Sequence, residues 1–466
     1  MIIPGIAKVM NDNDVDAVID AAISILEKTG VQVENSFLLD ILSSNGAVVD
    51  KNNQRARFPR KVTENMLETS EKFSKPADIH PSITSHVGIY HGYYLDPLDD
   101  QNKPWTQERL LQYVSIANQL PHIDSVSLLG YPAVQTGDIR QPLFEKWFSW
   151  KYGIHGGQSI WVTDLCPAIH EIWQIYADWQ KKDIKTLFNG TVYIISPLRF
   201  GKEEAEHFVY FYEKGLRVYI GWMGTLGTTL PVTLDGALAL NLAEGLFVNM
   251  FNRFCYGVKK LELHTAIAVT DMRTCVFQYG RPEQTLLNTA GAQIAERLGA
   301  SYNGHTGLSD AKEPGYESAG QKVYSALSGA LTYGSGDIAA GLLSVDEVYS
   351  PVQMILDDEM TGAIKQTLKN ISVSRETLAI EEIDEVGPGG MFMNHEHTAE
   401  HFRDVLWLPQ LWSRESFGIW REEGNKNAIN RALEKYRALL ENIVEPVMPE
   451  KVERELLKVI EQQNMR

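Results

Sequence analysis

Short runs of β-branched and aromatic residues alternate with longer amphipathic segments over most of the chain. The short runs predict strands at 88–94, 125–130, 159–163, 187–194, 217–222, 262–266, 301–305 and 337–343. The segments between them carry apolar residues at helical spacing and predict helices at about 106–119, 141–150, 166–180, 201–214, 234–253, 283–298, 315–333 and 351–368. Strand–helix alternation is typical of a parallel sheet. Eight such units predict an α/β fold with a closed (β/α)8 TIM barrel.

The pattern changes at both ends of the chain, which predicts three regions. Residues 1–85 form a mainly helical N-terminal extension, and the barrel occupies residues 86–370. Residues 371–466 form a C-terminal loop and helical cap, which contains the glycine-rich stretch 387–397. Aromatic residues gather between 407 and 420. We therefore expect this region to pack on the barrel and to contribute to a homo-oligomer.

Charge and cysteine content narrow the class of protein. The net charge of −17 disfavours binding to the phosphate backbone of nucleic acids and to anionic membranes. The three widely spaced cysteines do not suggest a disulfide framework and indicate a reducing compartment. The N-terminus lacks the pattern of a signal peptide, and no apolar run reaches the length of a membrane span. A cytoplasmic protein is expected.

The ends of the predicted strands carry the candidate chemistry, because barrel enzymes build their sites at the carboxyl ends of their strands. The positions there are Tyr94, Tyr131, Thr163, Asp164, Ser196, Trp222, Thr225, His264, Asp271, His305, Asp310 and Ser344. This set is rich in aromatic residues and poor in nucleophiles. Aromatic faces bind quaternary ammonium groups, which have no N–H to donate. The same aromatic residues are equally compatible with core packing.

Four other clusters have structural as well as functional interpretations. His395, His397 and His401 lie close in sequence, but they lack the HExxH arrangement, so we expect no metal. The GPGG stretch is not followed by Lys-Ser/Thr, which excludes a Walker phosphate loop. Acidic residues at 357–359 fit favourable charge near a helix N-terminus. Asp271 and Arg273 fit an ion pair, or Arg273 fits a clamp for a substrate carboxylate.

Several segments together resemble the trimethylamine methyltransferase family. They are YIISPLR at 193–199, GWMGTLGTTLPVTLDGALALNLAE at 221–244, TDMRTCVFQYGRPE at 270–283, SPVQMILDDE at 350–359 and GPGGMFMNHEHTAEHFR at 387–403. They occur in the expected order, and as a set they are far more specific than any one of them. The resemblance supplies the expected reaction, which composition and spacing do not.

The resemblance implies a barrel enzyme that moves a methyl group from a methylated amine to cob(I)alamin, the cobalamin form carried by a separate small corrinoid protein. One branch of the family contains pyrrolysine and acts on trimethylamine, whereas a larger branch lacks it and acts on quaternary amines such as glycine betaine. The present chain contains only standard residues, so it resembles the second branch.

The expected substrate-binding residues follow from this implied reaction. We expect Tyr94, Trp222 and Phe392 to surround the ammonium group, and His397, Arg273 and His305 to bind a substrate carboxylate. The reaction needs no general acid, because the leaving group is a neutral amine, and no catalytic residue is assigned. The corrinoid supplies the hard chemical step.

Two other hypotheses compete with this one. A zinc-dependent thiol or methanol methyltransferase would need clustered cysteine and histidine ligands, and the three cysteines are scattered. A non-catalytic quaternary-amine binding protein would normally be exported, which the N-terminus does not suggest.

Overall fold

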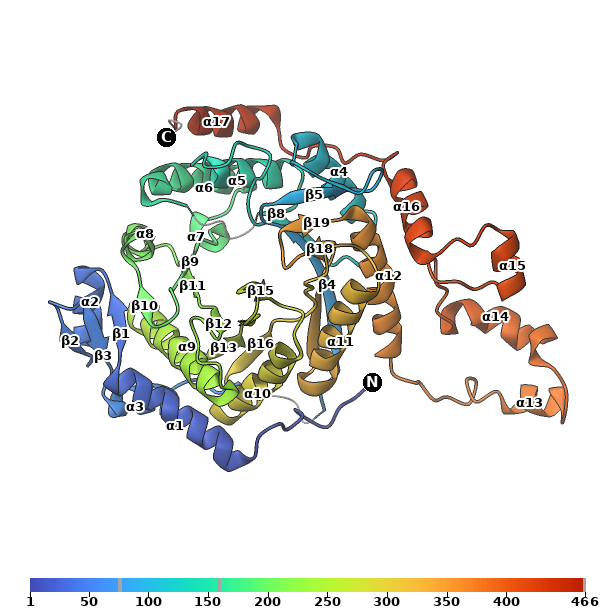
Figure 1. Cartoon of the computed structure of the whole chain (residues 1–466), viewed down its shortest axis with the longest axis horizontal. Coiled ribbons are helices and arrows are strands. Elements are labelled where there is room, and N and C mark those ends of the chain that lie inside the picture. The colour runs from blue at the N-terminus through green and yellow to red at the C-terminus, as the bar shows by residue number, and fades with distance from the viewer. Residues whose placement is uncertain (74–77, 157–160, 464–466) are drawn as a thin grey trace.

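Helices surround a group of short strands in the computed structural model (Figure 1), which describes residues 1–73, 78–156 and 161–463. The fold is therefore mixed α/β, as predicted. Helices form at all eight positions where the apolar rhythm predicts them. They are α4 (Gln107–Ala117), α5 (Gln141–Lys151), α6 (Cys166–Gln180), α8 (Lys202–Glu213), α9 (Leu234–Tyr256), α10 (Pro282–Leu298), α11 (Tyr316–Tyr333) and α12 (Pro351–Thr367).

Parallel strands lie inside the helices. The strands are β4 (Ser82–Ile89), β7 (Ser125–Leu128), β8 (His155–Gly156), β9 (Thr191–Tyr193), β11 (Tyr219–Gly221), β13 (Glu262–Thr265), β16 (Ser301–Gly304) and β17 (Ser335–Ala339). Strand β4 pairs with β7 and with β17, and β7 pairs with β8. Strand β9 pairs with β11, and β13 pairs with β16. The short continuations of β11 and β13, which are β12 (Gly224–Leu226) and β14 (Ile267–Thr270), also pair in parallel. Neighbouring strands in this order follow one another along the chain, as in a parallel sheet whose strands are joined by helices.

Three predicted strands do not coincide with observed ones. The prediction at 337–343 covers the end of β17, a turn at residues 340–341 and a separate strand, β18 (Leu342–Leu343). The prediction at 88–94 was wrong, because β4 ends at Ile89 and the next strand, β5 (Tyr93–Asp96), starts after a turn. Gly92 makes that turn with φ of +89°, where its missing Cβ lets the backbone approach Glu347. The prediction at 159–163 falls partly on residues 157–160, which lie outside the described residues.

The closed barrel is not confirmed, because the strand ladders of the described residues do not form a complete circle. Side-chain hydrogen bonds join neighbouring strands at two of the interruptions. Between β16 and β17, the hydroxyl of Thr306 donates to the carbonyl of Asp337 at 3.0 Å and accepts from its N–H at 2.8 Å. Between β11 and β13, His264 Nε2 bonds the carbonyl of Trp222 at 2.9 Å.

The N-terminal region contains, besides helices, a small sheet that the sequence did not predict. The helices are α1 (Asp12–Lys28), α2 (Ser36–Ser44) and α3 (Arg60–Glu68), and the strands are β1 (Val31–Val33), β2 (Val48–Asp50) and β3 (Arg55–Arg57). Asn11 caps α1 by accepting from the Asp14 N–H, and the apolar face of this helix, with Ala22 and Leu26, is buried. Strand β1 also pairs with β10 (Arg199–Phe200), which ties this region to the rest of the fold.

Further short strands lie in the loops that follow the parallel strands. They are β6 (Gln101–Lys103), β12 (Gly224–Leu226), β14 (Ile267–Thr270), β15 (Phe277–Gln278), β18 (Leu342–Leu343) and β19 (Val348–Tyr349). Two short helical elements, η1 (Thr163–Leu165) and α7 (Ile184–Leu187), flank α6. Strands β12, β14 and β15 form one small sheet, whose loops project at the carboxyl end of the parallel strands.

The C-terminal region is helical, but only part of it packs on the body. Its elements are α13 (Ile380–Val386), η2 (Phe392–Asn394), α14 (Glu396–Val405), α15 (Phe417–Glu422), α16 (Ala428–Leu439) and α17 (Glu450–Glu461). Helix α17 lies along α5 and α6, and α16 lies along α12. Helices α13 and α14 instead lie outside the ring of helices (Figure 1). Within the described residues, every helix is too short or too polar to cross a lipid bilayer.

Candidate active site

The inner faces of the parallel strands are polar. Along β4, Ile83, Ser85 and Val87 are buried, whereas Thr84 and His86 remain open. Successive side chains of a strand point to opposite faces, so the buried residues face the helices and the open ones face the centre. On β13 and β16, His264 and Asn303 stand opposite each other in the register. The centre of the fold is therefore lined by hydrogen-bonding groups rather than by packed apolar side chains.

A cavity of about 630 Å³ runs along the inner side of β11, β13 and β16. Its lining is aromatic and polar and includes Tyr193, Tyr219, Trp222, Met223, Glu262, His264, Asn303 and His305. At the start of β11, the Arg217 guanidinium lies 5.0 Å from the centre of the Tyr219 ring. This end of the cavity thus already has its own cation on an aromatic face. The opposite end of the cavity lies at the carboxyl ends of the strands, and we take it as the candidate ligand-binding end.

Trp222 and His264 form one unit in the cavity wall. Their rings are stacked, with centres 3.6 Å apart and 23° between the planes. The 2.9 Å bond to the Trp222 carbonyl fixes the tautomer, because a carbonyl oxygen only accepts. Nε2 of His264 therefore carries the hydrogen and Nδ1 is an acceptor. Burial lowers the pKa of His264, so the ring is neutral near pH 7.

His305 is held at the end of β16 by the side chains of α10. The amide of Asn288 donates to the His305 carbonyl at 2.8 Å and accepts from its N–H at 3.2 Å. Gln284 lies 3.4 Å from His305 Nδ1. Burial, together with the nearby His86 and His264, lowers the pKa of His305 to about 4. The ring is therefore an uncharged hydrogen-bonding group at neutral pH.

An aromatic ring covers this histidine. Tyr279 meets His305 edge to face, with ring centres 4.8 Å apart, and its hydroxyl reaches Met223 Sδ at 3.7 Å. Asp310 fixes the loop that carries this tyrosine, because its carboxylate accepts from the N–H groups of Tyr279 at 2.7 Å and Gly280 at 2.8 Å. Tyr279 is thus a rigid wall above the end of β16.

A second tyrosine and a carboxylate lie close to Tyr279. Burial raises the pKa of Tyr279, and the charges of Asp346 and Tyr193 raise it further. Tyr193 belongs to β9, and its ring lies across Gly221 of β11, where a Cβ would clash with it. Burial also raises the pKa of Asp346, while nearby His91 lowers it. Tyr193, Tyr279 and Asp346 thus combine aromatic faces with a carboxylate, which suits an organic cation.

The predicted site residues divide into two groups. Trp222 and His305 both line the cavity. Trp222 is only 4% exposed and stacked on His264, so it offers little surface to a ligand. Its role and that of His305 in binding stay predictions.

The other four predicted residues lie outside the lining of this cavity. Tyr94 is buried, packs on Trp105 at 5.4 Å and bonds the Tyr436 hydroxyl at 3.1 Å. Arg273 lies in an exposed loop after β14, while Phe392 and His397 belong to the C-terminal region. Their binding roles also stay predictions.

Tyr193, Tyr279 and Asp346 were missed by the strand-end reasoning. Tyr279 follows the short strand β15, and Asp346 lies in the loop between β18 and β19. The missed signal was in the sequence for the two tyrosines, because each belongs to a segment that carries the family resemblance.

The acidic groups singled out in the sequence are structural. Asp271 pairs with Arg281 at 2.8 Å and not with Arg273. It also caps its own loop by accepting from the N–H groups of Arg273 and Thr274, each at 3.0 Å. The interpretation of residues 357–359 as helix N-terminal charge was wrong, because Asp357 is fully buried and pairs with Lys322 at 2.6 Å.

The histidines near residue 397 have other partners than a metal. The rings of His397 and His401 lie 4.5 Å apart, and His395 lies 3.5 Å from Glu385. In the part of the chain that the structure describes, no three histidine, cysteine, aspartate or glutamate side chains are placed to hold a metal ion.

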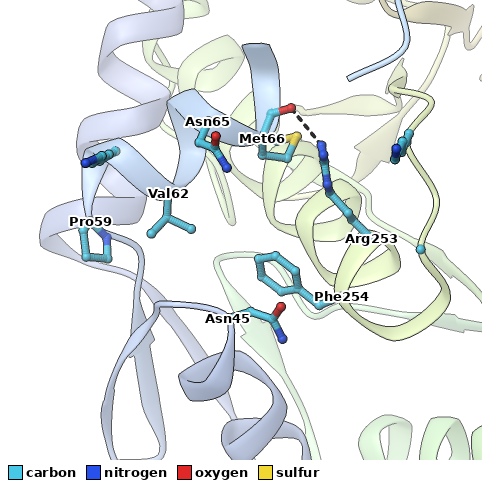
Figure 2. A pocket seen from close by; sticks show the side chains of 10 residues that line it. Asn45, Pro59, Val62, Asn65, Met66, Arg253 and Phe254 are labelled. Atoms are coloured by element: carbon cyan, nitrogen blue, oxygen red, sulfur yellow. Dashed lines mark hydrogen bonds between the residues drawn. The ribbon is translucent and has the colours of Figure 1, made fainter. Parts of the chain in front are cut away.

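A larger hollow, of about 780 Å³, lies between α3 and the end of α9 (Figure 2). Of its charged residues, Lys61, Arg253 and Lys259, the arginine already has partners, since it donates to the Met66 carbonyl at 3.0 Å and to the Thr69 hydroxyl at 2.7 Å. The end of α9 leads into the start of β13, so this hollow lies at the amino ends of the strands. Barrel-type sites form at the opposite ends, and this hollow is the weaker candidate.

Comparison with known proteins gives a family and several relatives. The family profile described as "Trimethylamine methyltransferase (MTTB)" matches residues 168–466. "Trimethylamine methyltransferase MttB" of Desulfitobacterium hafniense (strain DSM 10664 / DCB-2) is 23% identical over 99% of this chain and 96% of that protein. "Glycine betaine methyltransferase" of Desulfitobacterium hafniense (strain Y51) is 28% identical over 58% of this chain and 56% of that protein.

A solved structure also shows a remote similarity to the chain. The monomethylamine methyltransferase (MtmB) of Methanosarcina barkeri is 8% identical, with a TM-score of 0.47 over 94% of this chain and 95% of that one. This likeness is too remote to support a conclusion. The family match covers well over half of the sequence and confirms the predicted family. The chain therefore belongs to the trimethylamine methyltransferase family and is a methyltransferase.

Proposed function

We propose that this enzyme moves a methyl group from a quaternary amine, such as glycine betaine or a similar betaine, to the cob(I)alamin of a partner corrinoid protein. The observation that carries the proposal is the aromatic wall that Tyr279 forms over His305, with Tyr193 and the Asp346 carboxylate near Tyr279. Each cation–π contact contributes roughly 0.5–2 kcal/mol, most where water is excluded. The relative named as a glycine betaine methyltransferase supports this substrate class.

The protonation state of the cavity histidines favours a cationic substrate. His264 and His305 have lowered pKa values, so neither repels a positive charge at neutral pH. Their nitrogen atoms can instead hydrogen-bond a polar group of the substrate. We therefore place the ammonium group near Tyr193 and Tyr279, with His305 beside the rest of the molecule.

In this reaction the protein binds the substrate, orients it and excludes water from the site. When bound, the corrinoid supplies the nucleophile that accepts the methyl group. The departing tertiary amine leaves neutral, so no side chain has to protonate it. The rigid Tyr279, fixed through Asp310, would hold one methyl group in a single direction. Such alignment, in a site without water, is the source of the rate enhancement we propose.

Loops at the carboxyl ends of the strands suit a docking partner. Val232, Met272 and Val276 project there and are 62%, 59% and 48% exposed. Apolar side chains that gather in one exposed patch mark contacts with other proteins. We propose that the corrinoid protein approaches over these loops. We also infer that the enzyme works in the cytoplasm, where a reduced corrinoid can be maintained.

The order of the parallel strands supports a complete barrel as the working architecture. From β4 to β17 the strands follow one another, and β17 pairs back onto β4. We propose that the remaining seams close, through side chains such as Thr306 and His264, into a (β/α)8 barrel.

The alternative substrate is trimethylamine, which the relative that aligns over almost the whole chain supports by its name. An anaerobic assay of cob(I)alamin absorbance distinguishes the two. The enzyme is offered glycine betaine, carnitine, proline betaine and trimethylamine in turn, with free cobalamin and with a cognate corrinoid protein. Loss of cob(I)alamin with a quaternary amine is the expected result. Loss with trimethylamine alone would favour the alternative, and no loss with any amine would refute both.

A further inference from the structure

Arg217 is a charged side chain in the wall of the 630 Å³ cavity, and no carboxylate of the protein neutralises it. It lies two residues before Tyr219, the first residue of β11. Among the described residues, Arg217 forms no ion pair, and its buried Nε atom has no hydrogen-bond partner. A charged group that is partly removed from water is costly unless an anion or another acceptor meets it. Arg217 is therefore available to a ligand that carries a negative charge.

The arginine and the aromatic rings of the site lie on one wall. Arg217 and Tyr219 are two residues apart in an extended segment, so their side chains share a face. Gly221 of β11 stands beside Tyr193 of β9 in the parallel ladder, which places Tyr193 on the same face. Both strands lie inside the ring of helices (Figure 1), yet Tyr193 and Tyr219 are 39% and 43% exposed. Their rings therefore face the open cavity and can contact a ligand.

The spacing along this wall follows from strand geometry. The Arg217 guanidinium lies 5.0 Å from the centre of the Tyr219 ring, and Tyr193 stands at the level of Gly221. The two levels are two residues apart, which is roughly 6–7 Å along a strand. A cation at Tyr193 and an anion at Arg217 would be separated by about that distance.

The rest of the lining is compatible with a ligand that carries both charges. His264 and Asn303 face each other on β13 and β16 between the two ends, and neither is charged at neutral pH, since burial lowers the pKa of His264. At the amino ends of the strands, Glu262 also lines the cavity, but Arg217 and Lys260 outnumber it. The cavity thus has a positive inner end and an aromatic outer end, which suits a zwitterion whose ammonium group points outward.

We propose that Arg217 binds the carboxylate of the substrate, and that the substrate is a trimethylammonio acid with three or more carbons between its charged groups. The inference rests on the proposed function, which places the ammonium group near Tyr193 and Tyr279. A single carbon between the charges, as in glycine betaine, is too short to reach both ends, so that ligand is held mainly through its ammonium group. A planar guanidinium suits this role because it can bind a carboxylate through two parallel hydrogen bonds.

Calorimetry with two ligands separates the carboxylate from the ammonium group. One is the zwitterion trimethylammonio-butanoate, with three carbons between its charges, and the other is butyltrimethylammonium, which lacks the carboxylate. The wild type should bind the zwitterion roughly 10- to 100-fold more tightly, because hydrogen bonds between charged groups are strong. The two affinities should become equal in Arg217→Gln, and Arg217→Lys should restore part of the difference. The matched control, Arg454→Gln on the exposed surface of α17, should behave as the wild type.

Three outcomes of this experiment would contradict the inference. Equal affinities in the wild type, or equal losses of both ligands in Arg217→Gln, would overturn it and leave methyl transfer from a quaternary amine intact. Loss of the difference in Arg273→Gln alone would assign the carboxylate to the loop after β14 and would also overturn it. Failure of both ligands to bind the wild type would contradict the proposed function, and this inference with it.

A ligand series on the wild type keeps the test decisive if Arg217→Gln folds poorly. Trimethylammonio acids with one, two, three and four carbons between the charges are each compared with the alkyltrimethylammonium of equal chain length. The gain in affinity from the carboxylate should be small for one carbon and reach roughly 10- to 100-fold at three. A gain that is equal at every length, or absent at three and four carbons, would overturn the inference.

Discussion

The imidazole ring of His264 lies on the indole of Trp222, with ring centres 3.6 Å apart, and its Nε2–H donates to the Trp222 carbonyl at 2.9 Å. The stack and the hydrogen bond hold the ends of β11 and β13 together where these strands make no ladder. The contact lies just before the parallel ladder of β12 and β14 and forms part of the cavity lining.

Removing the hydrogen bond alone should weaken the fold. His264→Phe keeps a flat ring for the indole but leaves the Trp222 carbonyl without its donor, at a cost of about 1–3 kcal/mol in unfolding free energy. Urea unfolding measures this loss. His80→Phe, at an exposed position, is the control and should change stability by less than about 0.5 kcal/mol. Equal stability of the two variants would show that the bond contributes nothing.

The lowered pKa of His305 predicts a pH dependence of stability. The unfolded chain takes up this proton near pH 6.5, whereas the folded chain takes it up only near pH 4. The unfolded state therefore binds more protons between these values, and stability falls as the pH drops through this window. The loss attributable to His305 is at most about 3.4 kcal/mol, and above pH 6.5 it vanishes.

Comparison of the wild type with His305→Gln isolates this contribution. Urea unfolding at pH 7.5 and pH 5 should show a smaller loss of stability on acidification for the variant. Identical losses for both proteins would contradict a neutral, enclosed His305.

The buried ion pair Lys322–Asp357 predicts a large asymmetry between losing one partner and losing both. Lys322→Met leaves a buried carboxylate unpaired and should cost about 3–5 kcal/mol in unfolding free energy. Lys322→Met/Asp357→Leu should recover part of that loss. The control is Lys365→Met at the more exposed pair with Asp124, where we expect less than about 1 kcal/mol. A small effect of Lys322→Met would contradict the buried pairing.

The aromatic and acidic groups near the mouth predict a specific pattern in substrate affinity. Tyr279→Leu removes a ring face and should weaken binding of the quaternary amine by about 2- to 30-fold, whereas Tyr279→Phe keeps the face and should retain most of it. Asp346→Asn removes the carboxylate and should also weaken binding. Calorimetry with the cation and with its neutral tert-butyl analogue measures both effects. Equal losses for cation and analogue would show that the site recognises shape and not charge.

Sequence patterns predicted the helices well and the strands less completely. Amphipathic periodicity over ten or more residues specifies a helix, as in α9 and α12. Strands β1, β2 and β3 have three residues each, too few for an alternating pattern to be recognised. Gly92 moved a strand boundary because its turn interrupts an otherwise continuous apolar run.

The site was predicted only in part, because strand ends can be recognised in sequence and the course of the loops cannot. Trp222 and His305 follow strands directly, so strand ends locate them in the cavity wall. Tyr279 and Asp346 stand on loops whose course is set by tertiary contacts such as the Asp310 hydrogen bonds. Asp357 was misinterpreted because it lies more than one turn inside α12, on the side that faces Lys322. Charge at a helix start and charge inside a core look alike in sequence.

The central claim is methyl transfer from a quaternary amine, and isotopic labelling tests it most directly. Glycine betaine with deuterated N-methyl groups is incubated anaerobically with the enzyme, the corrinoid protein and a reductant. The account predicts equal amounts of deuterated methyl-cobalamin and dimethylglycine, with both products reduced in Tyr279→Leu at subsaturating substrate. Unlabelled cobalamin and unchanged glycine betaine, with carnitine and proline betaine also inert, would contradict the claim.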